Sequence, residues 1–180
     1  VALQIGAEAR EIVPGHNNNL TFWSPTVNLL RDSRWGRADE SMGEDPYLTG
    51  QIASQFVNGL EGKDMDGQAI DENGYLQAVA TIKHFIGNNS EHNRLNGTTD
   101  ITQTEMREYY GKVYQNIIEQ SDVTSAMTSY NRVNIMSEAE RESDPDSAYD
   151  KANDRPASLD NYTMDVLLRA TYGFDGYITS

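Results

Sequence analysis

Short apolar runs alternate with amphipathic helical stretches along most of the chain, and this alternation is the feature that most restricts its fold. The apolar, β-branched runs predict strands at residues 20–30, 78–85, 123–131 and 177–180. Apolar residues spaced three and four apart predict helices at residues 1–12, 47–60, 102–120 and 157–171. Helices that separate successive strands in this way are typical of βαβ units. We therefore predict an α/β fold, with four parallel, adjacent strands and the helices outside them.

Two of these helices begin with recognisable capping residues. Asp45 and Pro46 precede the helix at 47–60, as an N-cap followed by a proline in the first helical position. Thr102 and Glu105 have the spacing of a capping box at the start of the helix at 102–120. Both helices are therefore expected to begin where these residues stand.

Composition excludes several classes of function. The chain has 180 residues, enough for one domain with a sizeable core, and 14 basic residues against 28 acidic ones. Its net charge of -14 argues against nucleic acid or an anionic membrane as a partner. No apolar run could span a bilayer and no secretory signal segment is recognisable, so the compartment stays open among secreted, periplasmic and cytoplasmic.

The sequence contains no motif that indicates a cofactor or a metal. Cysteine is absent, which excludes thiol catalysis and cysteine-ligated metal. His84 and His92 flank a turn and lack the spacing of a helical metal site. No glycine-rich phosphate loop follows any strand, which also disfavours an unrelated barrel enzyme that binds a phosphate. We expect no cofactor and no metal.

The stretch AVATIKHFIGNNSEHNR, residues 78–94, is the strongest candidate for a functional site. A short apolar run is followed by Lys83 and His84, and glycine and two asparagines then end the strand. In parallel α/β folds, chemistry lies at the C-terminal ends of the strands. The alternative is a solvated lysine at a strand end beside a satisfied core histidine. We favour a site, because desolvating an ammonium group without a purpose is costly.

The stretch RDSRWGRADESMGEDP, residues 31–46, is rich in arginine and carboxylates and poor in core residues. One interpretation is a solvated, salt-bridged loop, whose exposed ion pairs add little stability. The other is a long βα loop that presents one arginine to a ligand, since the guanidinium donors form a rigid fork suited to a pair of hydroxyls or a carboxylate. Both interpretations stay open on these residues alone.

Four segments together resemble glycoside hydrolase family 3, the retaining β-glucosidases and β-xylosidases. They are NLLRDSRWGRADESMGEDPYLTG, IKHFIGNNSEHNR, MTSYNRVN and LLRATYGFDGYITS, in the order of the family. The resemblance implies a (β/α)₈ barrel, which takes about 250 residues when complete, so residues 1–180 are expected to form part of one such domain. Residues 135–155 replace a short turn of the family and are expected to be an exposed insertion. Apolar side chains at open edges, Val1, Ile5 and Ile178, are expected to be uncovered.

The resemblance also implies which residues contact the sugar. Arg37, in WGR, matches an arginine that binds the sugar in the first subsite. Lys83 and His84 match a pair that hydrogen-bonds its hydroxyls. Arg94, in EHNR, matches an arginine of many β-glucosidase-like members, and Tyr130, in SYN, matches a tyrosine beside the nucleophile. Charged donors of this kind form the stronger hydrogen bonds to neutral sugar hydroxyls.

The carboxylates of the loop at 31–46 match no sugar-binding position. Glu40, Glu44 and Asp45 are expected to orient the arginine loop rather than to touch sugar. Asp175, in GFDG, matches a structural turn, and we do not expect it to be catalytic. The resemblance instead places the nucleophilic aspartate directly after Ser180 and the acid/base glutamate on a later domain. These 180 residues are therefore expected to hold no catalytic carboxylate and to be inactive alone.

The implied function is that of a retaining β-glycosidase acting on terminal, non-reducing β-linked sugars of an oligosaccharide or glycoside. The form IKHFIGNNSEHNR favours glucose over xylose. Two alternatives stay open: a β-xylosidase of the same family, and a module that binds sugar without cleaving it. The remaining partner implied is the rest of the parent chain, with the other barrel strands and a second domain.

Overall fold

Four parallel strands form the main sheet of the protein. The computed structural model describes residues 1–12, 20–137, 139, 142 and 154–180. The strands are β1 (Thr21–Phe22), β2 (Val79–Phe85), β4 (Ser125–Thr128) and β7 (Tyr177–Thr179), in the order β1-β2-β4-β7. Each neighbouring pair is parallel. The predicted α/β fold with parallel, adjacent strands is thus confirmed, and it is the arrangement from which (β/α)₈ barrels are built.

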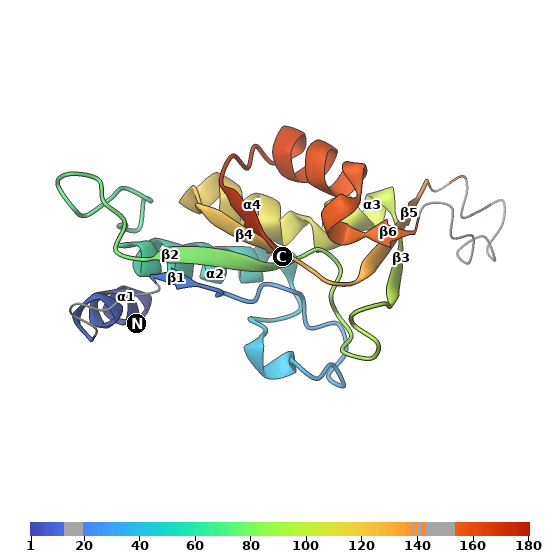
Figure 1. The fold of residues 1–180 in the computed structure, drawn as a ribbon, viewed down its shortest axis with the longest axis horizontal. Coiled ribbons are helices and arrows are strands. Elements are labelled where there is room, and N and C mark those ends of the chain that lie inside the picture. The colour runs from blue at the N-terminus through green and yellow to red at the C-terminus, as the bar shows by residue number, and fades with distance from the viewer. Residues whose placement is uncertain (13–19, 138, 140–141, 143–153) are drawn as a thin grey trace.

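One helix precedes these strands and the other helices lie between them in the chain (Figure 1). The long ones are α1 (Ala2–Glu11), α2 (Pro46–Glu61), α4 (Lys112–Ser121) and the π-helical η6 (Tyr162–Thr171). The short ones are η1 (Ala38–Glu40), α3 (Gln103–Glu105), η2 (Met106–Tyr110) and η5 (Ala157–Leu159). α2 packs against both α1 and α4.

Both predicted helix starts are confirmed. Asp45 is the N-cap of α2, where its Oδ1 accepts a hydrogen bond of 2.6 Å from the backbone N–H of Leu48, and Pro46 follows in the first turn. Thr102 and Glu105 form the capping box of α3. These side chains satisfy backbone N–H groups that have no partner inside the helix.

The first predicted strand is shorter than expected. Within residues 20–30 only Thr21–Phe22 forms a strand, and Thr26 makes an isolated bridge with Lys83. Pro25 lies between them and has no N–H to donate to a ladder, so the pairing is interrupted there. Val27 and Leu29 are nevertheless buried, and this segment runs beside the end of β2.

A second, smaller sheet was not predicted. It consists of β3 (Thr98–Thr102), β5 (Arg132–Met136) and β6 (Arg155–Pro156). In Figure 1 it lies beyond the ends of β2 and β4. Residues 135–136 and 155 of the expected insertion pair in this sheet; Met136 is buried and Arg155 is exposed. That residues 135–155 form an exposed insertion stays a prediction. Residues 138, 140–141 and 143–153 of that expectation lie outside the described residues.

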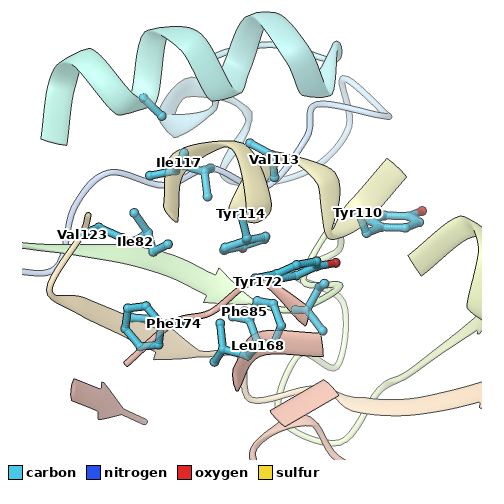
Figure 2. Close-up of a cluster of buried hydrophobic side chains, with 14 of the residues drawn as sticks. Ile82, Phe85, Tyr110, Val113, Tyr114, Ile117, Val123, Leu168, Tyr172 and Phe174 are labelled. Carbon is cyan, nitrogen blue, oxygen red and sulfur yellow. The ribbon is translucent and has the colours of Figure 1, made fainter. Parts of the chain in front are cut away.

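The core between β2 and the helices fixes the position of the strand (Figure 2). Phe85 of β2 meets Tyr114 of α4 edge to face, with 5.0 Å between the ring centroids. Ile82 and Ile117 are fully buried in the same cluster. Burial of each such side chain stabilises the folded state by about 1.5–3 kcal/mol. Since Phe85 directly follows the Lys83–His84 pair, this packing holds the candidate site in place.

Apolar side chains are uncovered near the first helix. Val1 is fully exposed and Ile5 is 37% exposed, whereas Ile178 in β7 is half-buried. α1 instead packs through its small residues Ala2 and Gly6. A Cβ at Gly6 would come within 2.6 Å of the carbonyl oxygen of Leu60, so a larger residue there would push α1 off α2. Among the described helices, none is long and apolar enough to cross a bilayer.

Candidate active site

His84 is the buried centre of the candidate site and is 6% exposed. Its backbone N–H donates to Oδ1 of Asn28 over 2.8 Å, and its carbonyl oxygen accepts from Nδ2 of Asn28 over 3.0 Å. The same carbonyl accepts a hydrogen bond of 2.8 Å from the hydroxyl of Tyr114. The core tyrosine and Asn28 together fix the backbone at the end of β2. Sequence reasoning did not single out Asn28.

The protonation of the His84 ring follows from its partners. Nη1 of Arg37 lies 2.8 Å from Nε2 of His84, and a guanidinium can only donate, so Nε2 accepts. Nδ1 then carries the hydrogen and donates to Oδ1 of Asn28 over 3.1 Å. Burial, followed by the positive charges of Arg37 and Lys83, lowers the pKa of His84 to about 3. His84 is therefore a neutral ring that positions Arg37.

Arg37 is held by a two-point ion pair. Its Nε and Nη2 donate to Oε1 and Oε2 of Glu40 over 2.7 and 2.6 Å. These hydrogen bonds lower the pKa of Glu40 to about 2, so the carboxylate stays ionised. Oε2 also accepts from the hydroxyl of Thr26 over 2.8 Å. Glu40 thus orients the arginine, the role expected for it.

Lys83 shares that carboxylate at a longer distance. Its Nζ lies 3.9 Å from Oε2 of Glu40, and its side chain is 15% exposed. Burial, followed by the charge of Arg37, lowers the pKa of Lys83. Among the described residues this distant carboxylate is the only ion-pair partner of the ammonium, so the ammonium can donate to another acceptor.

Arg94 belongs to the segment that follows β2 and is tied to the arginine loop through Glu91. Its Nη1 donates to Oε2 of Glu91 over 3.0 Å. The other oxygen of Glu91 accepts from the indole N–H of Trp35 over 3.1 Å. Trp35 is buried and lies two residues before Arg37. Glu91 therefore joins the two loops that carry the arginines.

Tyr130 follows β4 in a turn that is bonded to the end of β2. The backbone N–H of Ser129 donates to the carbonyl of Phe85 over 2.6 Å, and its hydroxyl donates to the carbonyl of Ile86 over 2.9 Å. Nδ2 of Asn131 donates to the same Ile86 carbonyl over 3.2 Å. The Tyr130 side chain between these anchors is 45% exposed.

These segments meet around one small hollow, with a cavity volume of about 10 Å³. It is lined by Arg37, His84, Asn88, Arg94 and Tyr130. Four of the five residues that the sequence singled out thus come together from three separate segments. The fifth, Lys83, does not line it but lies beside it, facing the carboxylate that holds Arg37. Asn88 is a lining residue to which sequence reasoning gave no role beyond ending the strand.

Asp175 lies elsewhere. It is exposed in the turn before β7, whereas the hollow is at the C-terminal ends of β2 and β4. Because the strands are parallel, the start of β7 is at the opposite edge of the sheet. This placement agrees with the structural role expected for the GFDG turn.

Comparison with known proteins identifies the family of this arrangement. The model of the "Glycosyl hydrolase family 3 N terminal domain" matches residues 2–180. The chain belongs to glycoside hydrolase family 3. It is 34% identical to the probable β-D-xylosidase 7 of Arabidopsis thaliana, over the whole chain and 22% of that protein. It is 30% identical to the exo-1,4-β-xylosidase of Aspergillus niger, over the whole chain and 20% of that protein.

Solved structures of family 3 have the same fold. A β-glucosidase 3B from Thermotoga neapolitana in complex with glucose gives a TM-score of 0.73 at 26% identity, covering 98% of this chain and 20% of that one. A family 3 exo-β-xylosidase in complex with a xylobiose aziridine probe gives 0.74 at 28% identity, covering 99% and 20%. The chain spans about a fifth of the length of the curated relatives that it matches.

Proposed function

We propose that the protein containing this chain is a retaining β-glycosidase that hydrolyses terminal, non-reducing β-D-glucosyl residues. In this proposal Arg37, Lys83, Arg94 and Tyr130 bind the sugar of the first subsite, and His84 holds Arg37. The observation that carries it is the hollow at the C-terminal ends of β2 and β4, which is lined by Arg37, His84, Arg94 and Tyr130, with Lys83 beside it. Family membership and relatives named as β-glucosidases and β-xylosidases support it.

The donors around the hollow suit a neutral sugar. Adjacent hydroxyls of a pyranose match the fork of an arginine, and hydrogen bonds to charged donors are the stronger kind. Lys83, Arg37 and Arg94 also place positive charge beside the hollow, which favours the ionised form of a neighbouring carboxylate. Retaining glycosidases need such an ionised nucleophile and a second carboxyl group about 5–5.5 Å away. In this proposal Lys83, Arg37 and Arg94 bind and orient the sugar, and their positive charge keeps the nucleophile ionised.

A second candidate is a β-xylosidase of the same family. It is supported by the curated relatives named above, which are named as xylosidases. The solved structures named above include a β-glucosidase and a β-xylosidase. The two sugars differ by the hydroxymethyl group at C5, so the ratio of kcat/KM on matched glucosides and xylosides separates the two functions. A module that binds sugar without turnover is the third outcome.

The test uses the full-length protein and the release of nitrophenol from the 4-nitrophenyl β-D-glucoside and β-D-xyloside. We expect turnover, with the glucoside preferred. Lys83→Ala should lower kcat/KM roughly 30- to 100-fold, because it removes a charged donor to the sugar. Arg34→Ala is the matched control, since Arg34 is exposed and pairs with Asp32 outside the hollow.

Two results would contradict the proposal. Binding of glucose without hydrolysis of either substrate would assign the protein to the sugar-binding alternative. Unchanged kcat/KM in the Lys83→Ala variant would leave Lys83 with no role in sugar binding, as a partly buried residue that faces Glu40. Preference for the xyloside would replace glucose by xylose and leave the reaction class intact.

A further inference from the structure

Asn88 is the polar side chain of the hollow whose role neither the sequence nor the mechanism above explains. It is 6% exposed, and its Oδ1 is buried without a hydrogen-bond partner in the described part of the chain. Buried polar groups in folded proteins nearly always have a partner. Asn88 lines the hollow together with Arg37, His84, Arg94 and Tyr130. The Asn88 amide oxygen, which has no partner in the described part of the chain, is therefore available to a ligand.

Most of the other side chains that line the hollow cannot accept a hydrogen bond from a sugar hydroxyl, whereas the Asn88 carboxamide can. A sugar hydroxyl accepts hydrogen bonds and also donates one. Arg37 and Arg94 can only donate, and the single acceptor of the His84 ring, Nε2, already receives a hydrogen from Arg37. The side-chain acceptors left among the described lining residues are the Asn88 carboxamide and the Tyr130 hydroxyl. A hydroxyl that accepts from an arginine can then donate to one of them.

The backbone that carries Asn88 is held in place against the second sheet. It follows Gly87, whose φ of 83° turns the chain at the end of β2. A Cβ at Gly87 would lie 3.1 Å from Cγ2 of Thr99 in β3, so the turn is packed against the second sheet. The hydroxyl of Thr99 also donates to the carbonyl of Gly87 over 3.0 Å. The backbone that carries Asn88 is thereby fixed, while rotation of the amide about its last torsion can present either oxygen or nitrogen.

We infer that Asn88 is a further substrate-binding residue, which hydrogen-bonds one hydroxyl of the sugar in the hollow and accepts or donates where the arginines can only donate. This inference rests on the proposed function, because it takes the ligand to be a neutral sugar. It goes beyond that function by assigning a specificity-determining contact to Asn88.

The experiment compares the full-length protein with its Asn88→Ala variant by titration calorimetry, using glucose, xylose and the monodeoxy analogues of glucose. We expect Asn88→Ala to weaken glucose binding about tenfold. We also expect one monodeoxy analogue, the one that lacks the contacted hydroxyl, to bind both proteins equally. Asn96→Ala is the matched control, because Asn96 is an exposed asparagine of the same loop that does not line the hollow.

Two results would overturn the inference alone. One is an equal loss of affinity for all analogues, which would mean that Asn88 shapes the site without contacting a particular hydroxyl. The other is unchanged affinity in Asn88→Ala while Arg37→Ala abolishes binding, which would leave the proposed function standing. Failure of the parent protein to bind either sugar would overturn both. If Asn88→Ala does not fold, the same comparison is made with Asn88→Asp, which keeps the shape of the side chain.

Discussion

At the scale of single residues, the protonation state and the role of His84 are set by the residues that surround it. His84 is buried between Asn28 and Arg37, and both ring nitrogens are bonded. Its lowered pKa of about 3 follows from burial and from the adjacent cations. A neutral, fully bonded ring does not act as a general base, so its contribution is to orient Arg37.

This environment predicts how the protein responds to acid. The folded-state pKa of His84, about 3, lies below the ordinary value of 6.5. Between these values the unfolded chain binds the proton and the folded chain does not, so the free energy of unfolding should fall as the pH drops from about 6.5 towards 3. NMR of the His84 ring, assigned with a His84→Gln variant, should show no titration between pH 5 and 8. A midpoint near 6.5 would contradict the buried, Arg37-bonded ring.

Some residues of the candidate site could be predicted from the sequence and others could not. Arg37, Lys83, His84, Arg94 and Tyr130 could be chosen because charged and aromatic residues stand in recognisable segments at strand ends. Asn28 and Asn88 could not. Asparagine is common in turns, and its role here depends on which strands lie side by side and which polar atoms remain unpaired after folding.

At the scale of elements, periodicity and capping gave the helices and the main sheet, while short polar strands were missed. Strand β3 has the sequence TTDIT and exposes Thr98 and Asp100, so it has no clear apolar pattern. Its pairing with β5 depends on contacts far apart in the chain, among them the hydrogen bond from Nδ2 of Asn134 to Oδ1 of Asp100, 2.9 Å long. Only the folded structure brings these strands together.

The start of α2 gives a prediction at this scale. Asp45→Ala removes the acceptor for the N–H of Leu48 and should lower the free energy of unfolding by about 1 kcal/mol, measured by urea denaturation. Glu44→Ala removes a neighbouring exposed carboxylate without removing the cap and should change stability by less than about 0.5 kcal/mol. Equal effects of the two substitutions would show that overall charge, rather than capping, matters here.

At the scale of the whole molecule, a buried ion pair ties the elements together at the edge of the sheet opposite the hollow. Glu61, at the end of α2, is fully buried and lies 2.8 Å from Nζ of Lys63. Its Oε1 accepts from the hydroxyl of Thr124 over 2.9 Å. Nζ of Lys63 donates to the carbonyls of Ser121 and Asp122 over 2.8 and 3.0 Å. The pair thus joins α2 to the end of α4 and to the segment that enters β4.

A double-mutant cycle tests this link. Glu61→Leu and Lys63→Met should each lower the free energy of unfolding by about 3–5 kcal/mol, because each leaves an uncompensated buried charge. The double variant should lose clearly less than the sum, since it buries no charge without a partner. Losses that simply add, measured by urea denaturation, would show that the two side chains act independently.

We propose that Arg37, Lys83, Arg94 and Tyr130 form one sugar site at the ends of the strands, with Arg37 held by His84. The most direct test is a crystal structure of the full-length protein with bound glucose. We expect a sugar in the hollow, with donors of Arg37 and Lys83 about 2.7–3.2 Å from its oxygens. Glucose bound elsewhere, or bound with the Arg37 and Lys83 side chains directed away from it, would show that these residues do not form the sugar site.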